Sequence, residues 1–365
     1  MKIRRRENLV CRWSADGLQV GLPGQHRWAK VSPQLFAVLD KAAEWTDADT
    51  LAAEFDEELA PQVRKALATM TDLGVLVTED TETPAMWRHW GDVTERFHVD
   101  ARDANYLVDS PERAEVAGAI VAEGGSPPIF KDYPGAPLVM LPRKPLPLHT
   151  AVDEVFTRRR THRLFQDAPV SLDQLGTLLF YSFAPQRFIS GGPFGPQQAR
   201  VSASAGGRHE VEAYLVAYDV EGVPPGLYHY SPRLHALELL HTDASRARVA
   251  ELSYHQEPSY SGAFTVFTTA VADRLAWKYR HPRAYRLWMY DAGHYGQTFD
   301  LTCTALGLGP FQTVAFPDTE VEKFLGVDSD QEFVAYLLAA GVPEENGALP
   351  VDFAHPEPTV ITGSA

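Results

Sequence analysis

The sequence predicts an α+β protein in which a mixed sheet flanked by helices follows a small N-terminal unit. Strand-like and helix-like segments alternate from about residue 149 to residue 345, and a hairpin lies among the strands. Three short helical segments with clear start signals occupy the first 80 residues. With 365 residues, 45% of them hydrophobic, the chain can bury one large core and one small one.

Residues 1–80 read as a compact unit of their own. A strand-like piece at Leu18–Leu22 precedes three helices. Ser32 is an N-cap followed by proline, Asp47 stands before the second helix, and Pro61 opens the third, which stops at Gly74. The strand-like stretch VLVTED follows. This order predicts a winged-helix-like domain.

A winged helix usually suggests DNA, but the third helix carries only two cations, Arg64 and Lys65, in a chain of formal charge −15. Nucleic acid needs clustered Lys and Arg, so none is expected as a partner. The arrangement resembles the leader-peptide recognition element of enzymes that modify ribosomally made peptides, where a peptide adds to an exposed sheet edge. A purely structural appendage is the alternative.

Two further segments have biased composition. Pro and Gly accumulate within residues 81–148, which predicts an extended linker that wraps the following domain. Residues 346–365 predict a flexible tail.

Residues 149–345 form the predicted main domain. A helix is expected at 150–160, a second helix after the capping box of Ser171 and Gln174, and a long helix over 283–306 that ends at Gly307. The expected strands are EVEAYLVAYDV, GLYHYS, HALELL, AFTVFTTAV, FQTVAF and EFVAYLLAAG.

Composition excludes several classes of protein. The acidic balance argues against an anionic-membrane surface, and no apolar run is long enough for a membrane span or signal peptide. Cys11 and Cys303 have neither disulfide-framework nor metal-ligand spacing, so we expect no metal. A cytoplasmic protein is the default.

Arg159, Arg160, Thr161 and Arg163 form a basic cluster at a predicted helix end. Arginine binds phosphate bidentately and a hydroxyl adds a donor, so the cluster could hold an anion. A basic helix end that complements the helix dipole is the simpler alternative.

Two glycine-containing stretches could approach a ligand closely. Ser204, Ala205, Gly206 and Gly207 precede a strand, and ALGLGPFQTVAF joins a helix to a strand. A tight turn and a glycine C-cap explain these glycines equally well.

The order and spacing of these motifs, over about residues 140–345, resemble the flavin-dependent nitroreductase superfamily. GLYHYSPRLHALELL, Lys278-Tyr279 and RAYRLWMYDAGH are similar to its SagB-type dehydrogenase branch. The resemblance implies a homodimer with two FMN sites at its interface. It also implies that Arg159, Arg160, Thr161 and Arg163 grip FMN, with phosphate charge falling on Arg159, Arg163 and Arg208.

Further roles follow from the same resemblance. Ser204, Ala205, Gly206 and Gly207 would contact the flavin from the other subunit. Val314 and Ala315 match the turn whose backbone N–H points at flavin N5.

Lys278 and Tyr279 are the candidate catalytic residues by that resemblance. The SagB-type branch oxidises azoline rings to azoles, and this reaction needs a proton acceptor. Burial beside cations can lower the pKa of a lysine, which makes it a better acceptor. Without the family context, such a pair is most simply a solvated surface with the lysine stem lying along it.

The resemblance implies an FMN-dependent dehydrogenase that oxidises thiazoline or oxazoline rings to azoles in a ribosomally made precursor peptide, with a cyclodehydratase complex as a further partner. Two alternatives stay open. One is an NAD(P)H-dependent reductase of a nitro, quinone or dehydroamino-acid substrate, and the other is a non-catalytic peptide-binding scaffold.

Overall fold

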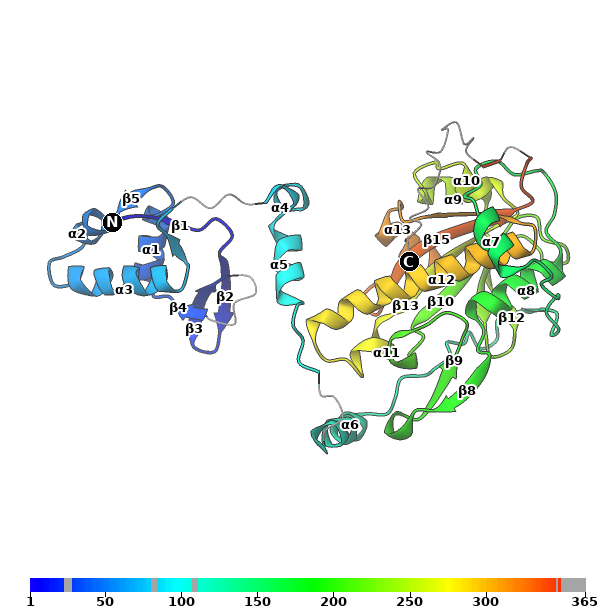
Figure 1. The fold of residues 1–365 in the computed structure, drawn as a ribbon, viewed down its shortest axis with the longest axis horizontal. Coiled ribbons are helices and arrows are strands. Elements are labelled where there is room, and N and C mark those ends of the chain that lie inside the picture. The colour runs from blue at the N-terminus through cyan, green and yellow to red at the C-terminus, as the bar shows by residue number, and fades with distance from the viewer. Residues whose placement is uncertain (23–27, 80–83, 107–110, 346, 349–365) are drawn as a thin grey trace, which may run out of the picture. The chain divides into compact units, whose positions relative to one another are not determined.

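The chain divides into two compact units (Figure 1). The computed structural model describes residues 1–22, 28–79, 84–106, 111–345 and 347–348. One unit comprises Met1–Tyr106 with His281–Arg283, and the other comprises Leu107–Arg280 with the chain from Ala284 onward. The predicted tail at 346–365 lies outside the described residues apart from Gly347 and Ala348. Among the helices described, none is both long and apolar enough to cross a membrane.

The N-terminal unit combines short strands with short helices. Its described strands are β1 (Lys2–Arg5), β2 (Val10–Ser14), β3 (Gly17–Gly21), β4 (Trp28–Lys30), β5 (Thr46–Asp47) and β6 (Leu76–Val77). Its described helices are α1 (Pro33–Lys41), α2 (Ala48–Ala53), α3 (Ala60–Asp72), α4 (Ala85–Trp90) and α5 (Asp92–Asp100). The strands form two antiparallel sheets, ordered β5-β1-β6 and β2-β3-β4.

The three helices predicted within residues 1–80 are confirmed, with their start signals. The Ser32 hydroxyl accepts a hydrogen bond from the Leu35 amide at 3.2 Å, and the Asp47 carboxylate accepts from Asp49 and Thr50. These bonds satisfy first-turn amides that have no partner within the helix. Buried side chains of β1, β3 and the three helices then share one core.

The expectation of an extended linker over residues 81–148 is wrong for its first half. Helices α4 and α5 lie here, and α6 (Pro111–Glu123) follows. The α6 segment is rich in Ala and Glu, which are good helix formers, whereas the Pro and Gly residues gather after it. From Gly124 the chain is extended, and its strand β7 (Leu138–Met140) pairs with the main sheet.

The second unit holds the main sheet. Its described strands are β7, β8 (Arg187–Ser190), β9 (Pro196–Ala199), β10 (Val211–Ala217), β11 (Gly226–Ser231), β12 (Ala236–His241), β13 (Phe264–Val271), β14 (Gly309–Thr313) and β15 (Glu332–Gly341). Its described helices are α6, α7 (Val152–Arg158), α8 (Leu172–Phe183), α9 (Arg246–Leu252), α10 (Pro258–Ser261), α11 (Ala272–Ala276), α12 (Leu287–Ala305) and α13 (Asp318–Leu325).

Seven strands of this unit form one sheet in the order β14-β15-β13-β10-β11-β12-β7. The predicted α+β class is confirmed, but all pairings between the neighbouring strands described are antiparallel, so the sheet is not mixed in direction. Tight connections link β10, β11 and β12 in sequence, and such connections join antiparallel neighbours. β8 and β9 pair separately as a hairpin.

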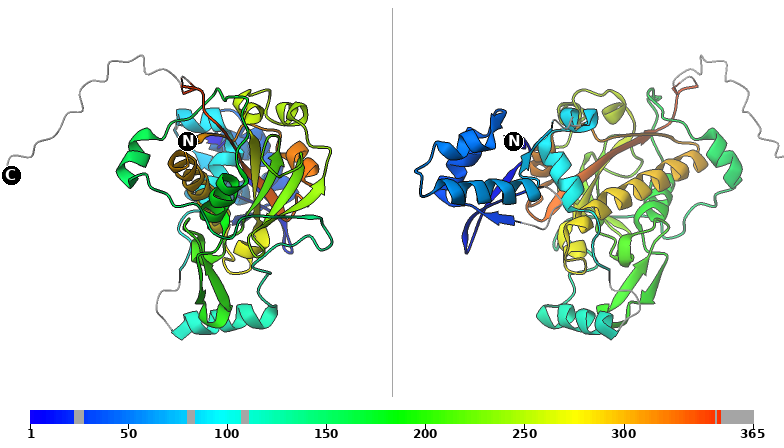
Figure 2. Two further views of the ribbon diagram at one scale, coloured as in Figure 1. Left: turned by 90° about the vertical axis from the view of Figure 1, so that its right-hand side faces the viewer. Right: turned by 60° about the vertical axis from the view of Figure 1, so that its left-hand side comes forward.

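Helices cover both faces of the sheet (Figures 1 and 2). Leu215 on β10 packs in one core with side chains of α8 and α12, while its neighbour Val216 packs in the other with α9 and α13. Successive strand residues point to opposite faces, so β10 is buried on both. The predicted Ser171/Gln174 capping box is present at the start of α8.

The predicted long helix is confirmed with a later start. A 3₁₀ turn, η3 (Pro282–Arg286), precedes α12, which runs from Leu287 to Ala305. Gly307 follows with φ +74°, a conformation that suits glycine at a helix end. Helix α12 packs beside α8 across one face of the sheet and carries the acids of the candidate site.

Candidate active site

Two clusters lie along α12, each made of predicted site residues and one acid of that helix. We call the first the lysine cluster, which contains Ser204–Gly207, Lys278, Tyr279 and Asp291. We call the second the arginine cluster, which contains Arg159–Arg163 and Asp300. Asp291 and Asp300 are nine residues apart on α12, or about 13 Å along its axis.

In the lysine cluster, the structure brings the predicted catalytic pair against the predicted glycine turn. Lys278 Nζ donates a hydrogen bond to the Gly206 carbonyl at 3.3 Å. Gly206 has φ +61°, and a Cβ added to it would collide with the Tyr279 hydroxyl and lie 2.6 Å from Lys278 Nζ. Glycine therefore suits the backbone conformation here, and a side chain at this position would displace the ends of Tyr279 and Lys278.

Lys278 lies in a partly buried environment with other cations nearby. Lys278 is half-buried, and its Nζ lies 4.9 Å from the centre of the Phe194 ring. Phe194 ends the 3₁₀ turn η1 (Gly192–Phe194) between β8 and β9. Burial, followed by the positive charges of Arg208 and Arg113, lowers the pKa of Lys278. A lysine of lowered pKa is better suited to accept a proton near neutral pH.

Helix α12 fixes the turn from the opposite side. The Ala205 amide donates to Asp291 Oδ2 at 2.9 Å, and a His294 ring nitrogen lies 3.2 Å from the Ala203 carbonyl. The Ser204 hydroxyl accepts a hydrogen bond from the His209 amide at 2.8 Å. Backbone and side-chain bonds thus hold the turn in one conformation.

In the arginine cluster, Arg159 lies beside a buried acid. Its Nη1 is 3.7 Å from Asp300 Oδ2, which also accepts a hydrogen bond from Gln312 at 3.2 Å. Burial raises the pKa of Asp300 to about 7, and the charge of Arg159 offsets this only in part. Asp300 is therefore only partly ionised near neutral pH, so the positive charge of Arg159 is incompletely neutralised.

The neighbouring arginines differ from Arg159. The Arg160 guanidinium is exposed and donates to the Thr157 and Arg159 carbonyls, each at 2.8 Å, at the end of α7. Arg160 therefore fits the simpler alternative, a basic residue that complements the dipole at a helix end. The exposed Arg163 guanidinium lies 6.0 Å from the centre of the Phe311 ring on β14. Thr161 is partly exposed between them.

Val314 and Ala315 follow the end of β14 directly. Val314 is 61% exposed. The Ala315 amide donates to the Thr313 hydroxyl at 3.1 Å, and the Ala315 carbonyl accepts from Gln256 at 3.0 Å. The Ala315 N–H is thus engaged within the chain.

One residue expected near phosphate has other partners. The Arg208 side chain is buried and donates to the Arg274 carbonyl at 2.9 Å and to the Ser126 hydroxyl at 3.0 Å. It also lies over the Trp277 ring at 4.9 Å. Arg208 therefore joins three segments of the chain around Lys278.

Phe194, Glu210 and Asp300 are absent from the site predicted by sequence. The signal for Asp300 is its position on the predicted helix over 283–306. For Phe194 the glycines that flank it mark only a turn. Glu210 gives no signal, because nothing in its local sequence indicates burial beside another acid.

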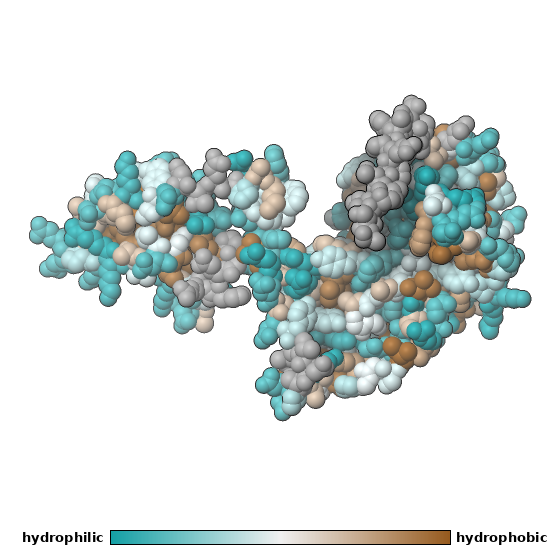
Figure 3. Space-filling model, in the orientation of Figure 1, coloured by the Kyte–Doolittle hydropathy of each residue, from teal (hydrophilic) through white to brown (hydrophobic). Residues whose placement is uncertain are grey.

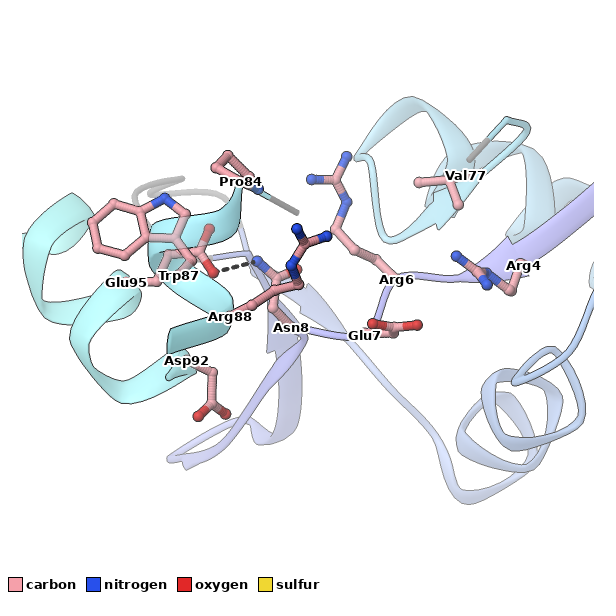
Figure 4. A pocket seen from close by; sticks show the side chains of 10 residues that line it. All are labelled: Arg4, Arg6, Glu7, Asn8, Val77, Pro84, Trp87, Arg88, Asp92 and Glu95. Carbon is pink, nitrogen blue, oxygen red and sulfur yellow. Dashed lines mark hydrogen bonds between the residues drawn. The ribbon is translucent and has the colours of Figure 1, made fainter. Parts of the chain in front are cut away.

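The N-terminal unit has a pocket of about 370 Å³ (Figure 4). Three cations and three carboxylates line it together with Trp87: Arg4, Arg6, Arg88, Glu7, Asp92 and Glu95. Asn8 donates to Glu95 at 3.4 Å. The charges balance, so this pocket does not offer the net positive surface that nucleic acid requires.

Comparison with known proteins finds relatives of this chain among proteins named for trifolitoxin. The chain is 31% identical over 163 residues to the trifolitoxin-processing protein TfxB of Rhizobium leguminosarum bv. trifolii, covering 44% of each protein. It is 23% identical over 190 residues to the trifolitoxin operon protein TfxC of the same bacterium, covering 50% of this chain and 53% of TfxC. The chain thus spans about half the length of these relatives.

Structure comparison finds the same fold elsewhere. A crystal structure of a candidate nitroreductase from Anabaena variabilis superposes with a TM-score of 0.54 at 22% identity, covering 74% of this chain and 50% of that one. The model of the nitroreductase family matches residues 156–342, just over half of the chain. The protein therefore belongs to the nitroreductase family.

Proposed function

We propose that the protein is an FMN-dependent dehydrogenase of the SagB type that oxidises azoline rings to azoles in a ribosomally made peptide. The observation that carries the proposal is the position of Lys278 and Tyr279 against Gly206, beside the turn expected to approach the flavin. The similarity to a protein named for trifolitoxin processing supports a peptide substrate.

The residues present fit FMN in two respects. Arg159 keeps an incompletely neutralised charge beside the buried Asp300, and the exposed Arg163 adds a second cation for a phosphate. At the Ser204–Gly207 turn, Gly206 and Gly207 both have positive φ and lack side chains, so the backbone can lie close to a ligand bound beside Lys278 and Tyr279. In this proposal the arginine cluster and Thr161 hold the phosphate end, and the turn contacts the ring system.

A homodimer would unite these two parts of the site. Within one chain they lie near different ends of α12, so a second copy can supply the turn that faces the arginine cluster. Large apolar side chains are exposed around that cluster, and Figure 3 shows apolar atoms on the face around α7. They are Val152 (66% exposed), Phe156 (60%), Leu164 (45%) and Val314 (61%). Burial of such a patch favours association.

The chain's own residues supply the proton chemistry. Conversion of an azoline to an azole removes two hydrogens, one as a proton and one as a hydride. FMN, when bound, is the hydride acceptor. Lys278, with its lowered pKa, takes the proton from the ring carbon, and Phe194 limits the access of water to its Nζ. Tyr279 borders the same space and orients the ring.

In the same proposal the N-terminal unit binds the leader of the precursor peptide. The edges of its β2-β3-β4 sheet can receive an extended strand, and Trp13 on β2 is 81% exposed. Azolines arise by cyclodehydration, so a cyclodehydratase complex is the proposed partner. The proposed location is the cytoplasm, where such precursors are made.

The test is direct. The purified protein is analysed for bound flavin and incubated in air with a thiazoline- or oxazoline-containing peptide, and mass spectrometry should detect the loss of two hydrogens. An unchanged peptide with rapid bleaching of the flavin by NAD(P)H would favour the reductase. Protein that lacks flavin yet binds the peptide would favour the scaffold.

A further inference from the structure

His209, which lies two residues after Gly207, has a backbone conformation that is uncommon for a residue with a side chain. Its φ is +46°, and the residue is only 3% exposed. A non-glycine residue with positive φ is strained, and it persists only where the surrounding structure holds it in place. The contacts of His209 must therefore offset this strain.

The backbone of His209 bonds to both sides of the contact between Lys278 and Gly206. Its amide donates to the Ser204 hydroxyl at 2.8 Å, within the turn that carries the Gly206 carbonyl. Its carbonyl accepts from Arg274 Nη1 at 3.0 Å, and Arg274 lies on α11, four residues before Lys278. His209 therefore joins the turn that provides the acceptor to the helix that precedes the donor.

Both ring nitrogens of His209 are bonded as well. Nε2 lies 3.0 Å from the Gln198 carbonyl on β9, and Nδ1 lies 2.7 Å from the Tyr295 hydroxyl on α12. A carbonyl only accepts, so Nε2 carries the proton. The Tyr295 hydroxyl accepts from Arg200 at 3.4 Å, and its own proton is available to Nδ1. Burial and the charge of Arg200 lower the pKa of His209 to about 3, which agrees with a neutral ring.

Ser204 extends these bonds into the turn. Its hydroxyl, which accepts from His209, donates to Glu210 Oε2 at 3.4 Å. Its carbonyl accepts from the Gly207 amide at 3.0 Å. A displacement of His209 would therefore move Ser204 and, with it, the Gly206 carbonyl that receives Lys278.

A second histidine has the same local arrangement outside the lysine cluster. His235, between β11 and β12, has φ +51°. Its Nδ1 lies 2.8 Å from the Tyr230 hydroxyl, and its Nε2 lies 3.1 Å from the Pro142 carbonyl. The two histidines share their backbone conformation and their ring partners, a tyrosine hydroxyl and a backbone carbonyl. They differ in the segments that they hold, so His235 is a matched control for His209.

We propose that His209 is a positioning residue, which holds the Ser204–Gly207 turn in place for its contact with Lys278. His209 acts through the turn, because its ring is buried and both of its nitrogens are bonded within the chain. The inference deepens the proposed function, and its catalytic consequence rests on that function.

His209→Asn and His235→Asn are the matched variants. Asparagine tolerates positive φ, and its Oδ1 can accept a hydrogen bond in place of Nδ1, but it has no group in place of Nε2. Each variant therefore loses one bond to a backbone carbonyl. His209→Gln, whose side-chain amide can donate to Gln198, is used in both experiments below if His209→Asn does not fold.

Acetylation of lysines, followed by mass spectrometry, tests the positioning role with no azoline peptide present. Lys278 of the purified His209→Asn protein should react faster than in the wild type, relative to the exposed Lys323, because its amine loses a fixed acceptor. His235→Asn should leave this rate unchanged. An unchanged rate in His209→Asn, or an equal rise in His235→Asn, would overturn the proposal.

Steady-state kinetics with an azoline peptide test the catalytic consequence, below the thermal unfolding midpoint of each variant. The kcat of His209→Asn should fall by about 10²-fold with little change in KM, the loss expected when a reacting group is misplaced by about 1 Å. His235→Asn should keep the wild-type kcat. Equal losses of kcat in the two variants would show that His209 has only a structural role.

The two experiments also separate this proposal from the proposed function. If the wild-type protein oxidises no azoline peptide, the proposed function fails. The acetylation rates of Lys278 still decide whether His209 positions the turn.

Discussion

The lysine cluster and the arginine cluster both contain a buried acid of α12, yet the two acids are satisfied differently. Asp291 accepts a backbone amide at 2.9 Å, whereas Asp300 lies 3.7 Å from the Arg159 guanidinium and its Oδ1 has no partner among the described residues. The first arrangement fixes a turn in one geometry. The second leaves a cation with unused binding capacity. This difference is consistent with the proposed roles, in which the lysine cluster transfers a proton and the arginine cluster binds the phosphate of FMN.

The largest expected effect comes from removing the base of the lysine cluster. Lys278→Ala should lower the rate of azoline oxidation by about 10²- to 10⁴-fold, because a positioned base contributes that much. Flavin content and dimer formation should be unchanged, as measured by absorbance and sedimentation. Arg280→Ala is the matched control, since it removes an exposed cation two residues away that pairs with Glu123. Near wild-type oxidation in Lys278→Ala would remove the catalytic assignment.

Gly206→Ala tests whether the turn must keep its conformation and lack a side chain at this position. The new Cβ would displace Tyr279 and Lys278, and a shift of about 1 Å can reduce a rate about 10²-fold. A positive φ also costs an alanine about 1–2 kcal/mol of folding free energy. Gly222→Ala is the control, because Gly222 has φ +75° but its Cβ would meet only Leu172 at 4.0 Å. Equal loss of turnover in both variants would show that backbone strain alone is responsible.

Substitutions at adjacent positions of the arginine cluster should have different effects on FMN binding. Arg159→Gln should weaken FMN binding by about 10- to 100-fold, the range expected when one charged hydrogen bond is lost. Arg160→Gln should change affinity little, because its guanidinium already donates to the end of α7. Fluorescence titration of the flavin-free protein with FMN measures both. A larger effect from Arg160 would reverse our interpretation of the cluster.

The last prediction concerns the free energy of unfolding and its dependence on the ionisation of Asp300. Its folded pKa of about 7 exceeds its ordinary value of 3.8, so the folded state holds a proton that the unfolded state releases between these pH values. The free energy of unfolding of the wild-type protein should therefore fall from pH 4 to pH 7 relative to that of Asp300→Asn. Above pH 7 the difference between the two proteins should stay constant. Thermal unfolding should show a change of about 2–4 °C per kcal/mol. A constant difference in the free energy of unfolding would show that Asp300 is ionised throughout this pH range.

Much of the fold could be predicted because its signals are local. The Ser32 cap, the Ser171/Gln174 capping box and the strands Gly226–Ser231 and Glu332–Gly341 were each predictable from a few neighbouring residues. The prediction of an extended linker over residues 81–148 failed for its first half. It gave more weight to the prolines and glycines after Gly124 than to the helix-forming residues before it. The prediction of a sheet with mixed strand directions failed, because strand pairing depends on residues that are distant in the sequence.

The sequence by itself determined the positions of the helix caps, the locations of the main strands and the residue types that suggest a flavin site. Only the tertiary structure decided which of these residues meet. Lys278 reaches a carbonyl 72 positions earlier in the chain, and Asp300 meets Arg159 across 141 positions. Burial then sets their protonation, because desolvation and neighbouring charges depend on the completed packing and not on the identity of a residue.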